Sequence, residues 1–458
     1  MSVFGGTDRS TGKRAWVYAQ SVKGRFQRAH RWSGWALLAV LFVTPWIRIG
    51  GEPALLIDLP GRKLYTLGAV FTSRDTFFIV LMGLFAAFAL FLFTSLFGRL
   101  WCGFGCPQTV FLEELIRPLE QLWEGDRAKR RKRDMGPLTF DKAWRKAGKW
   151  ASYIVLGFGG AMTLMSYFAR SDELWQMQAA PGIYAVMAVL WVGFVLDYGW
   201  FREQFCNYLC PYARFQGALA DDESLVVAYE VSLGEPRRSR DNKKALPKPE
   251  LGACIDCNKC VVVCPTGIDI RDGYQLECIQ CARCVDACTG VLAKLDQPSL
   301  VNFTTVAAME GRKARWLRPR TVAYAALLSA LAAVFVGRLA TRHSIEVGLN
   351  RAPGTLYQVD ADGWTRNTYL LEMTSLQAKG EPVPLTVVVE GLPDGAELTV
   401  PPLSLRPDAV LKVPLVVRVP PGVPLPRTVP MKVHVRTPTD EVTAKGTFKS
   451  GATEALEG

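Results

Sequence analysis

The chain lacks the two glycine-rich loops by which proteins commonly hold nucleotides. It has neither a phosphate-cradling G-x-x-x-x-G-K-[ST] loop nor a G-x-G-x-x-G turn between a strand and a helix. We therefore expect no nucleotide or nicotinamide to be bound here. An apolar leader is missing too: Met1–Arg31 is polar and basic throughout, so we expect no secretory signal peptide.

Histidine is also scarce, with three residues in a chain of 458. Only His30 precedes an apolar stretch, and one histidine cannot supply both axial ligands of a bis-histidine haem. What the chain does have is a particular mixture, because 49% of its residues are hydrophobic and 21% are charged. Apolar membrane spans joined to charged segments would give this mixture, and the length is enough for two to four domains.

The net charge of +12 is unevenly distributed. The segment from Thr341 to the C-terminus has 12 basic and 13 acidic residues, so residues 1–340 have a net charge of +13. Such a basic excess can bind nucleic acid or face the cytoplasmic leaflet of a membrane. The apolar stretches favour the membrane, and we expect no nucleic-acid partner.

Five stretches are apolar enough to cross a bilayer, which takes about 20 residues in a helix. Trp and Tyr gather at several of their ends, as they do at the interfaces between membrane and water. We predict a bundle of five transmembrane helices: Trp32–Ile49, Phe77–Phe97, Trp150–Phe168, Ile183–Trp200 and Thr321–Leu339. Four of them lie within 32–200, and the fifth lies within 321–340.

Lysine and arginine in the flanking segments predict the orientation, because they collect on the cytoplasmic side. The tail at 1–31 is basic, and so is the loop at about 98–149, where we expect the run Arg127–Arg133 to face lipid. The loop between the third and fourth spans is short, and its only basic residue is Arg170. We therefore place 1–31, 98–149 and 201–320 in the cytoplasm, and 341–458 in the periplasm, of a multi-pass protein of the bacterial inner membrane.

Eight of the 12 cysteines form two runs between Cys254 and Cys288. In each run, three cysteines are separated by two residues, and a fourth follows after three more. Three such thiolates can surround one [4Fe–4S] cluster, while the fourth cysteine reaches the other cluster. We predict an α+β ferredoxin-like domain at about 245–300, with cluster 1 on Cys254, Cys257, Cys260 and Cys288, and cluster 2 on Cys278, Cys281, Cys284 and Cys264.

Structural zinc and disulfides are the competing interpretations of these two runs. Zinc sites need four ligands, commonly as separated C-x-x-C pairs, and do not require two interlocked runs of four cysteines. Disulfides are disfavoured because the charge pattern places this segment in the reducing cytoplasm. Two clusters in one small domain would lie close enough to exchange electrons, and such a module conducts electrons without making or breaking substrate bonds.

The other four cysteines form two matched pairs, Cys102-Gly-Phe-Gly-Cys106-Pro and Cys206-Asn-Tyr-Leu-Cys210-Pro. Each pair follows a predicted span that runs toward the cytoplasm, so all four thiols should lie at the cytoplasmic membrane boundary. The i,i+4 spacing would put both sulfurs of a pair on one face if the helix continues that far. Soft thiolates suit Cu(I), zinc or iron–sulfur sites. A pair of thiols can also cycle to a disulfide. The alternative to both functions is that these are small buried residues with a structural role only.

Acidic residues lie near both pairs. Glu113 and Glu114 follow the first pair and are expected at a solvated helix start. Asp197 lies near the cytoplasmic end of the fourth span, close to Cys206, where it could act in a site or simply reach water. His30, just before the first span, needs no special role as a polar residue at a headgroup boundary.

The segment after the fifth span has the pattern of an all-β domain. Its β-branched stretches alternate with polar residues, and Pro-Gly, Pro-Asp-Gly and Pro-Pro-Gly turns separate several of them. We predict an immunoglobulin-like sandwich with strands at Thr368–Thr374, Leu385–Glu390, Ala396–Val400, Val410–Val419 and Val429–Thr437. Met431, Val433 and Val435 should face its core and His434 the solvent. Without a visible catalytic group, this domain is expected to dock an assembly partner.

The residues around the boundary cysteines resemble those of a known family. Cys102-Gly-Phe-Gly-Cys106-Pro-Gln-Thr-Val110 and Arg202-Glu-Gln-Phe-Cys206-Asn-Tyr-Leu-Cys210-Pro-Tyr-Ala-Arg-Phe-Gln216 are similar to signatures of the cytochrome c oxidase accessory proteins, called FixG, RdxA or CcoG. The two ferredoxin-type runs, the five-span layout and the C-terminal β domain also match. The resemblance therefore covers essentially the whole chain.

This resemblance implies an enzyme, a cupric reductase that serves assembly of the cbb3-type oxidase. It would reduce Cu(II) to Cu(I) in the cytoplasm, before a copper-exporting P-type ATPase carries the ion outward. The catalytic and copper-binding residues would be Cys102, Cys106, Cys206 and Cys210. The implied partners are copper ions, that ATPase and the subunits or assembly factors of the oxidase, and a homo-oligomer is left open.

Two other functions stay open. Related membrane ferredoxins of the quinol-dehydrogenase type, such as those serving periplasmic nitrate reductase, also have paired C-x-x-x-C-P motifs, and their electrons come from quinol. A non-catalytic scaffold for oxidase assembly, with structural clusters, is the other. Because no nucleotide motif is present, the electrons should arrive from a protein donor or a membrane carrier.

Overall fold

The computed structural model describes residues 3–4, 7–8, 16–72, 75–239, 242, 251–341, 343–354, 356–376, 381–407, 409–438 and 440–450. The chain forms two compact units: Met1–Thr44 with Val80–Ala333, and Pro45–Ile79 with Val334–Gly458. Much of the basic tail predicted at 1–31, and residues 245–250 of the predicted ferredoxin-like segment, lie outside the described residues. Two short strands, β1 (Val3–Phe4) and β2 (Thr7–Asp8), pair near the N-terminus.

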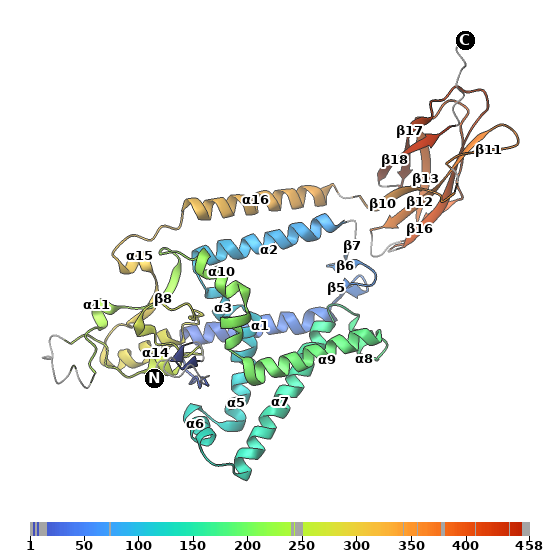
Figure 1. Ribbon diagram of the computed structural model, residues 1–458. Coiled ribbons are helices and arrows are strands. Elements are labelled where there is room, and N and C mark those ends of the chain that lie inside the picture. The colour runs from blue at the N-terminus through green and yellow to red at the C-terminus, as the bar shows by residue number, and fades with distance from the viewer. Residues whose placement is uncertain are drawn as a thin grey trace. The chain divides into compact units, whose positions relative to one another are not determined.

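Long helices occur at all five positions where spans are predicted (Figure 1). They are α1 (Arg25–Val43), α2 (Thr76–Phe97), α7 (Phe140–Met165), α9 (Pro181–Leu196) and α16 (Pro319–Ala340). The helix of α9 continues through a π-helical turn at Asp197–Phe201. Such turns interrupt the regular hydrogen-bond ladder and often mark functional sites.

Three helices in the described part of the chain are long and apolar enough to cross a membrane: Thr76–Phe97, Pro181–Phe201 and Pro319–Ala340. The other two long helices begin with charged turns. Helix α1 starts with Arg25 and includes Arg28 and Arg31, and α7 includes Lys142 through Lys149 before its apolar part. The five-helix membrane bundle therefore stays a prediction.

Short helices connect the long ones within the first unit. Between α2 and α7 the chain forms α3 (Leu100–Phe104), α4 (Pro107–Val110), a π-helical turn (Phe111–Ile116), α5 (Arg117–Glu124) and α6 (Arg127–Met135). Helix α8 (Ser171–Trp175) lies between α7 and α9. After α9 and its π-helical turn come a third π-helical turn (Phe205–Leu209) and α10 (Pro211–Leu219).

The ferredoxin-like segment is bracketed by two strands that pair antiparallel, β8 (Leu225–Tyr229) and β9 (Val301–Thr305). Between them lie α11 (Val231–Gly234), α13 (Lys259–Val262), a 3-10 turn (Ile270–Asp272) and α14 (Arg283–Leu292); α15 (Val306–Met309) follows β9. Val227 of β8, Val285 and Leu292 of α14, and Val301 of β9 pack in one core. The cysteine loops are thus held between a small sheet and a helix.

The C-terminal segment forms two antiparallel sheets, as its sequence pattern predicts. One has the order β10-β12-β16-β14 with β11 paired to β12, and the other has the order β15-β13-β17-β18. Their strands are β10 (Ile345–Arg351), β11 (Gln358–Val359), β12 (Thr365–Ser375), β13 (Val383–Glu390), β14 (Glu397–Thr399), β15 (Leu403–Leu405), β16 (Val410–Val419), β17 (Thr428–Arg436) and β18 (Glu441–Lys449).

The core of this sandwich confirms the predicted side-chain alternation in β17. Met431, Val433 and Val435 are all buried, at 2%, 0% and 0% exposure. His434 lies on the other face, between Glu390 at 3.2 Å and Glu441 at 3.0 Å. It is thus bound by two carboxylates, and more covered than the solvated residue the pattern predicts.

Small strands in residues 44–75 were not predicted. They are β3 (Arg48–Ile49), β4 (Glu52–Pro53), β5 (Leu55–Asp58), β6 (Lys63–Thr66) and β7 (Ala69–Phe71). The last three form an antiparallel sheet over the buried residues Leu56, Tyr65 and Val70. Strands of three or four residues give too little alternation for a sequence pattern to reveal them.

Candidate functional site

One hollow in the ferredoxin-like segment is lined by cysteines from both runs: Cys254, Cys257, Cys260 and Cys288. We call it the cluster-1 cavity. Its empty volume is about 410 Å³, and its walls are formed largely by Leu292 of α14, Val301 of β9 and their apolar neighbours. These four cysteines are the set that the crossed ligand pattern assigns to cluster 1.

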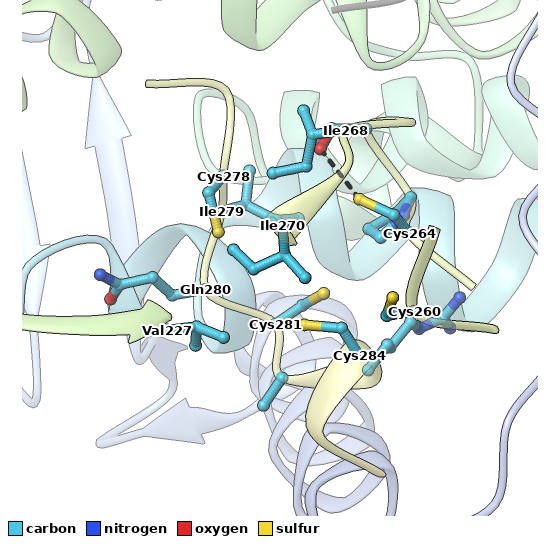
Figure 2. Close-up of a pocket in the computed structure, with 14 residues that line it drawn as sticks. Val227, Cys260, Cys264, Ile268, Ile270, Cys278, Ile279, Gln280, Cys281 and Cys284 are labelled. Carbon is cyan, nitrogen blue, oxygen red and sulfur yellow. Dashed lines mark hydrogen bonds between the residues drawn. The ribbon is translucent and has the colours of Figure 1, made fainter. Parts of the chain in front are cut away.

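A second hollow, the cluster-2 cavity, is lined by the other four: Cys264, Cys278, Cys281 and Cys284. Its empty volume is about 360 Å³. Figure 2 shows the sulfur atoms of these cysteines around the hollow, with Ile268 and Ile270 among its apolar walls. Cys260 lines both hollows, so the two cavities adjoin.

The two cysteine loops have the same backbone shape. Left-handed residues flank the middle cysteine of each: Asp256 (φ 54°) and Asn258 (φ 55°) in the first loop, Gln280 (φ 55°) and Ala282 (φ 58°) in the second. Positive φ is uncommon outside glycine, and Gln and Ala lack the enrichment that Asn and Asp show there. Alternation of right- and left-handed residues turns successive N–H groups to one side, which makes the anion-binding concavity found at many iron–sulfur sites. Donor set and backbone both fit [4Fe–4S] clusters.

The cavities differ in exposure. Cys257 at the cluster-1 cavity is exposed, whereas Cys278 and Cys281 at the cluster-2 cavity are each 7% exposed. Burial raises the pKa of both Cys278 and Cys281 to about 12. Free thiols there would be protonated at neutral pH, so binding of iron must displace their protons.

The two boundary pairs share a local geometry. The Cys106 N–H donates to the Trp101 carbonyl at 2.8 Å, and the Cys210 N–H donates to the Phe205 carbonyl at 2.9 Å. Both cysteines have extended dihedrals and cap a new helix that begins with proline, α4 and α10 respectively. The helix therefore ends between the two cysteines of each pair, and the continuous helix that would align their sulfurs is not formed. Proline at the first helical position is as expected.

The four boundary thiols lie within range of one another's charges. Burial raises the pKa of Cys102 to about 11, and negative charge on Cys106 and Cys210 adds to the rise. Burial likewise raises the pKa of Cys206, with contributions from each of the other three. The Gln216 side-chain amide donates to the Cys102 sulfur at 3.3 Å. The two pairs, about 100 residues apart in sequence, thus form one group, which we call the boundary thiol site.

Gly103, inside the first pair, lies directly against the cluster-2 loop. A Cβ atom at this position would be 2.6 Å from the Ile279 carbonyl oxygen and 3.0 Å from the backbone of Cys281. Only glycine permits so close an approach of two backbones. Arg99, one turn earlier, donates to the Leu276 and Ala213 carbonyls, and so links the cluster-2 loop to α10. The boundary thiol site and the cluster-2 cavity are therefore neighbours.

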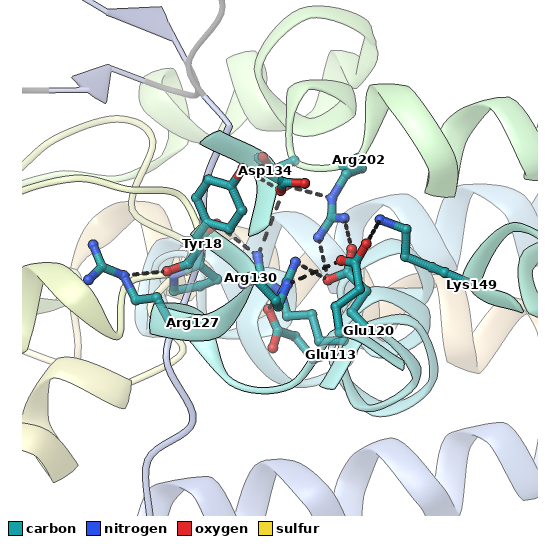
Figure 3. A network of polar contacts seen from close by, with 12 residues as sticks. Tyr18, Glu113, Glu120, Arg127, Arg130, Asp134, Lys149 and Arg202 are labelled. Carbon is teal, nitrogen blue, oxygen red and sulfur yellow. Dashed lines mark hydrogen bonds and ion pairs between the residues drawn. The ribbon is translucent and has the colours of Figure 1, made fainter. Parts of the chain in front are cut away.

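A buried network of ion pairs connects α5, α6 and the segment that follows α9. Figure 3 shows Arg202 and Arg130 directed at Glu120, which is 0% exposed; Arg130 lies 2.7 Å from it. Arg130 belongs to the run Arg127–Arg133 and is 2% exposed, so the prediction that this run faces lipid is wrong for Arg130. A sequence window counts its charges but does not reveal the acidic partners brought from a neighbouring helix.

The prediction that Glu113 and Glu114 lie at a solvated helix start is wrong. They are 5% and 7% exposed, not solvated, because both lie in the π-helical turn that faces the core of the first unit. Glu114 Oε1 lies 2.9 Å from His30 Nδ1. His30 is 1% exposed and packs on Phe104, which lies between the cysteines of the first boundary pair. Glu113 contacts two arginines. These residues support the site, and no motif marks them.

Matches to models of known protein families show the class of protein to which the chain belongs. Models of a 4Fe–4S dicluster domain, a 4Fe–4S binding domain and the immunoglobulin-like fold at the C-terminus of FixG match residues 201–306, 79–124 and 335–451. The chain is an iron–sulfur electron-transfer protein with membrane helices and an immunoglobulin-like domain.

Sequence identity to three known proteins shows the family to which the chain belongs. FixG, a nitrogen fixation protein of Rhizobium meliloti, is 32% identical, and the match covers 90% of this chain and 87% of FixG. RdxA and RdxB of Cereibacter sphaeroides are 32% and 34% identical over 82% of this chain, and over 82% and 83% of their own lengths. The chain belongs to the FixG and RdxA family.

Proposed function

We propose that this protein is a membrane-bound reductase that transfers electrons from two [4Fe–4S] clusters to Cu(II) at the boundary thiol site. The cysteines of the two cavities would hold the clusters, which supply one-electron transfer when bound. The observation that favours this function most is the contact of Gly103 with Cys281. It joins the turn between two boundary thiols to a loop of the cluster-2 cavity.

The boundary thiols suit the reduced ion better than the oxidised one. Each Cu(II) takes up one electron and becomes Cu(I), and a reduced protein carrier or a membrane quinol must replace that electron. Soft sulfur ligands favour Cu(I), so tighter binding of the product would help the reduction. Binding requires loss of thiol protons, and the raised pKa of Cys102, about 11, opposes this at neutral pH.

The thiols would also have to close around the ion. Among the described residues, no group of three or more Cys, His, Asp or Glu side chains has the geometry to hold a metal ion. At Cys106 and Cys210 one helical segment ends and the next begins, and the extended backbone at these two residues allows their sulfurs to move. We expect the ion to be held by two thiolates at first and by more as the site closes.

We further propose that this chemistry takes place on the cytoplasmic side and serves oxidase assembly. The basic residues of 1–31 and 98–149 support this orientation by the positive-inside rule. The role in supplying Cu(I), through a copper-exporting ATPase, to a cbb3-type oxidase is the one implied by the resemblance of the boundary cysteine segments to the cytochrome c oxidase accessory proteins. Pull-down of these partners with the C-terminal domain intact and deleted would test the docking role of the sandwich.

The direct test uses anaerobic, cluster-loaded protein reduced with dithionite and freed of excess reductant. Addition of Cu(II) should reoxidise the protein and form Cu(I), detected with a Cu(I)-specific chelator. The fourfold variant with Ser at 102, 106, 206 and 210 should keep its iron and lose this reaction. An unchanged rate in that variant would place the copper site elsewhere.

One observation favours a second candidate. The 4Fe–4S binding model matches 79–124, and the cysteines in that range are Cys102 and Cys106. The boundary thiols could thus hold a third cluster that exchanges electrons with membrane quinol. Protein loaded with about 12 iron atoms per chain, instead of about 8, would support this candidate.

A further inference from the structure

The two cluster cavities are bordered by ion-pair groups of opposite net charge. At the cluster-2 cavity, Glu113 lies between two arginines: its carboxylate is 2.6 Å from Arg283 and 2.9 Å from Arg117. At the cluster-1 cavity, Arg271 lies between two aspartates, 2.7 Å from Asp256 and 2.6 Å from Asp269. The first group has a formal charge of +1 and the second a charge of −1.

The first group, which we call the Glu113 clamp, contacts both segments that contribute cysteines to the cluster-2 cavity. Arg283 lies between the cavity cysteines Cys281 and Cys284 in the sequence. Arg117 donates to the Pro265 carbonyl at 3.0 Å, one residue after Cys264. All three clamp residues are less than 8% exposed. Charges this deeply buried are weakly screened, so they act strongly on a neighbouring centre.

Other charges near the cavities change this contrast little. Arg237 acts on Asp269, but it is itself paired with Glu235 at 3.1 Å. Arg99 and Glu277 lie near Cys278 and contribute one charge of each sign. Lys259, at the cluster-1 loop, is exposed and screened by solvent. Asp286 lies between Cys284 and Cys288, which line different cavities, so it affects both. Glu203 lies 4.0 Å from Arg117 but is itself paired with Arg202 at 3.4 Å.

We propose that the Glu113 clamp is an electrostatic device that raises the reduction potential of cluster 2 above that of cluster 1, so that electrons rest beside the boundary thiols. A reduced cluster bears more negative charge than an oxidised one, and a net positive group stabilises it. Burial alone has the opposite effect, because it disfavours the more highly charged state. The clamp offsets that penalty at the more buried of the two sites. This inference rests on the proposed assignment of the eight cysteines, and does not depend on copper.

The same helix connects the clamp to the boundary thiols. Glu113 and Arg117 lie in the continuous helical segment that starts at Cys106-Pro107 and runs through α4, the π-helical turn and α5. The π-helical turn places Glu113 toward Arg283 of α14. One segment thus contributes a boundary thiol at its start and the potential-setting charges two to three turns later.

Redox titration of the full-length, cluster-loaded protein, followed by EPR, tests the inference. Cys257→Ser and Cys278→Ser variants identify the signal of each cluster. In wild type, we expect the cluster-2 signal to appear at the higher potential. Glu113→Gln should raise that potential, and Arg283→Gln should lower it, whereas Arg283→Lys should leave it close to wild type. Arg117 keeps Glu113 ionised when Arg283 is replaced.

The opposite signs separate this role from a structural one. Glu113→Gln and Arg283→Gln break the same ion pair, so loosening of the fold would move both variants in the same direction. Shifts of the same sign, or reduction of cluster 1 before cluster 2 in wild type, would overturn the inference. Two controls apply. The cluster-1 potential should stay close to wild type in the clamp variants, and Glu310→Gln, which breaks an exposed ion pair with Arg312, should leave the cluster-2 potential unchanged. A chain that binds fewer than about eight iron atoms would contradict the cysteine assignment itself, which iron analysis shows before any titration.

Discussion

The first and second cysteine runs fold into the same loop and lie in different surroundings. Both have left-handed residues on either side of the middle cysteine, and both continue into a helix, α13 or α14. Yet the first loop presents Cys257 to solvent, whereas the second is buried against Gly103. A repeated sequence motif thus gives two cavities of similar chemistry, and the contacts around them decide which one reaches solvent and which one adjoins the boundary thiols.

The largest expected difference between the two sites comes from loss of one ligand. Cys281→Ser should abolish Cu(II) reduction by dithionite-reduced protein, because its cavity adjoins the boundary thiols. Cys257→Ser should keep a measurable rate, since cluster 2 can still be reduced chemically. Each variant should lose about four iron atoms. Equal loss of activity in the two variants would break the proposed order of the centres.

A second large effect is expected where the loops of two segments touch. Gly103→Ala would place a Cβ 2.6 Å from the Ile279 carbonyl oxygen, so α3 and the cluster-2 loop must separate. We expect the Cu(II) reduction rate to fall by about 10- to 100-fold, the scale seen when reacting groups are displaced by about 1 Å. Gly290→Ala in α14 is the matched control, because a Cβ there meets nothing within 4 Å. If both variants reduce Cu(II) at the wild-type rate, the Gly103 contact is not on the path.

The boundary thiols should show a moderate pH effect that the ligating cysteines of loaded clusters do not. Burial raises the pKa of Cys102 to about 11, and a raised pKa means less reactive thiolate at any pH below it. Alkylation of Cys102 by iodoacetamide, followed by mass spectrometry of copper-free protein, should therefore be slow at pH 7 and accelerate up to about pH 11. Fast labelling at neutral pH would show that the site is not buried, and complete resistance at high pH would indicate a bound third cluster.

The smallest effect is expected at the exposed site. Asp256→Asn removes one negative charge beside the cluster-1 cavity and keeps a residue that tolerates positive φ. The potential of cluster 1 should rise, but by less than Glu113→Gln raises that of cluster 2, because Asp256 is 29% exposed and Glu113 is 3% exposed at the side chain. Redox titration of both variants measures the two shifts in reduction potential and so their ratio. An equal or larger shift for Asp256→Asn would mean that burial does not govern the difference.

The sequence was most informative where the chemistry requires fixed spacing. The cysteine spacing anticipates both sets that line the cavities, and alternation anticipates the buried face of β17 around Val433. The contacts of Glu113 were missed because a π-helical turn moves it off the solvent face that an ideal helix would give it. The grouping of Cys102 with Cys206 was implied only by the family resemblance, because two segments about 100 residues apart meet only through tertiary packing.

The proposal that electrons pass through the clusters to Cu(II) at the boundary thiols is tested most directly by one anaerobic titration. Fully reduced, cluster-loaded protein is titrated with Cu(II) while cluster absorbance and chelated Cu(I) are recorded together. Two one-electron clusters should give about two Cu(I) per chain, and substitution of all four boundary cysteines by serine should abolish the reaction without loss of iron. Cu(I) formation at the wild-type rate and yield in the serine variant would contradict the account.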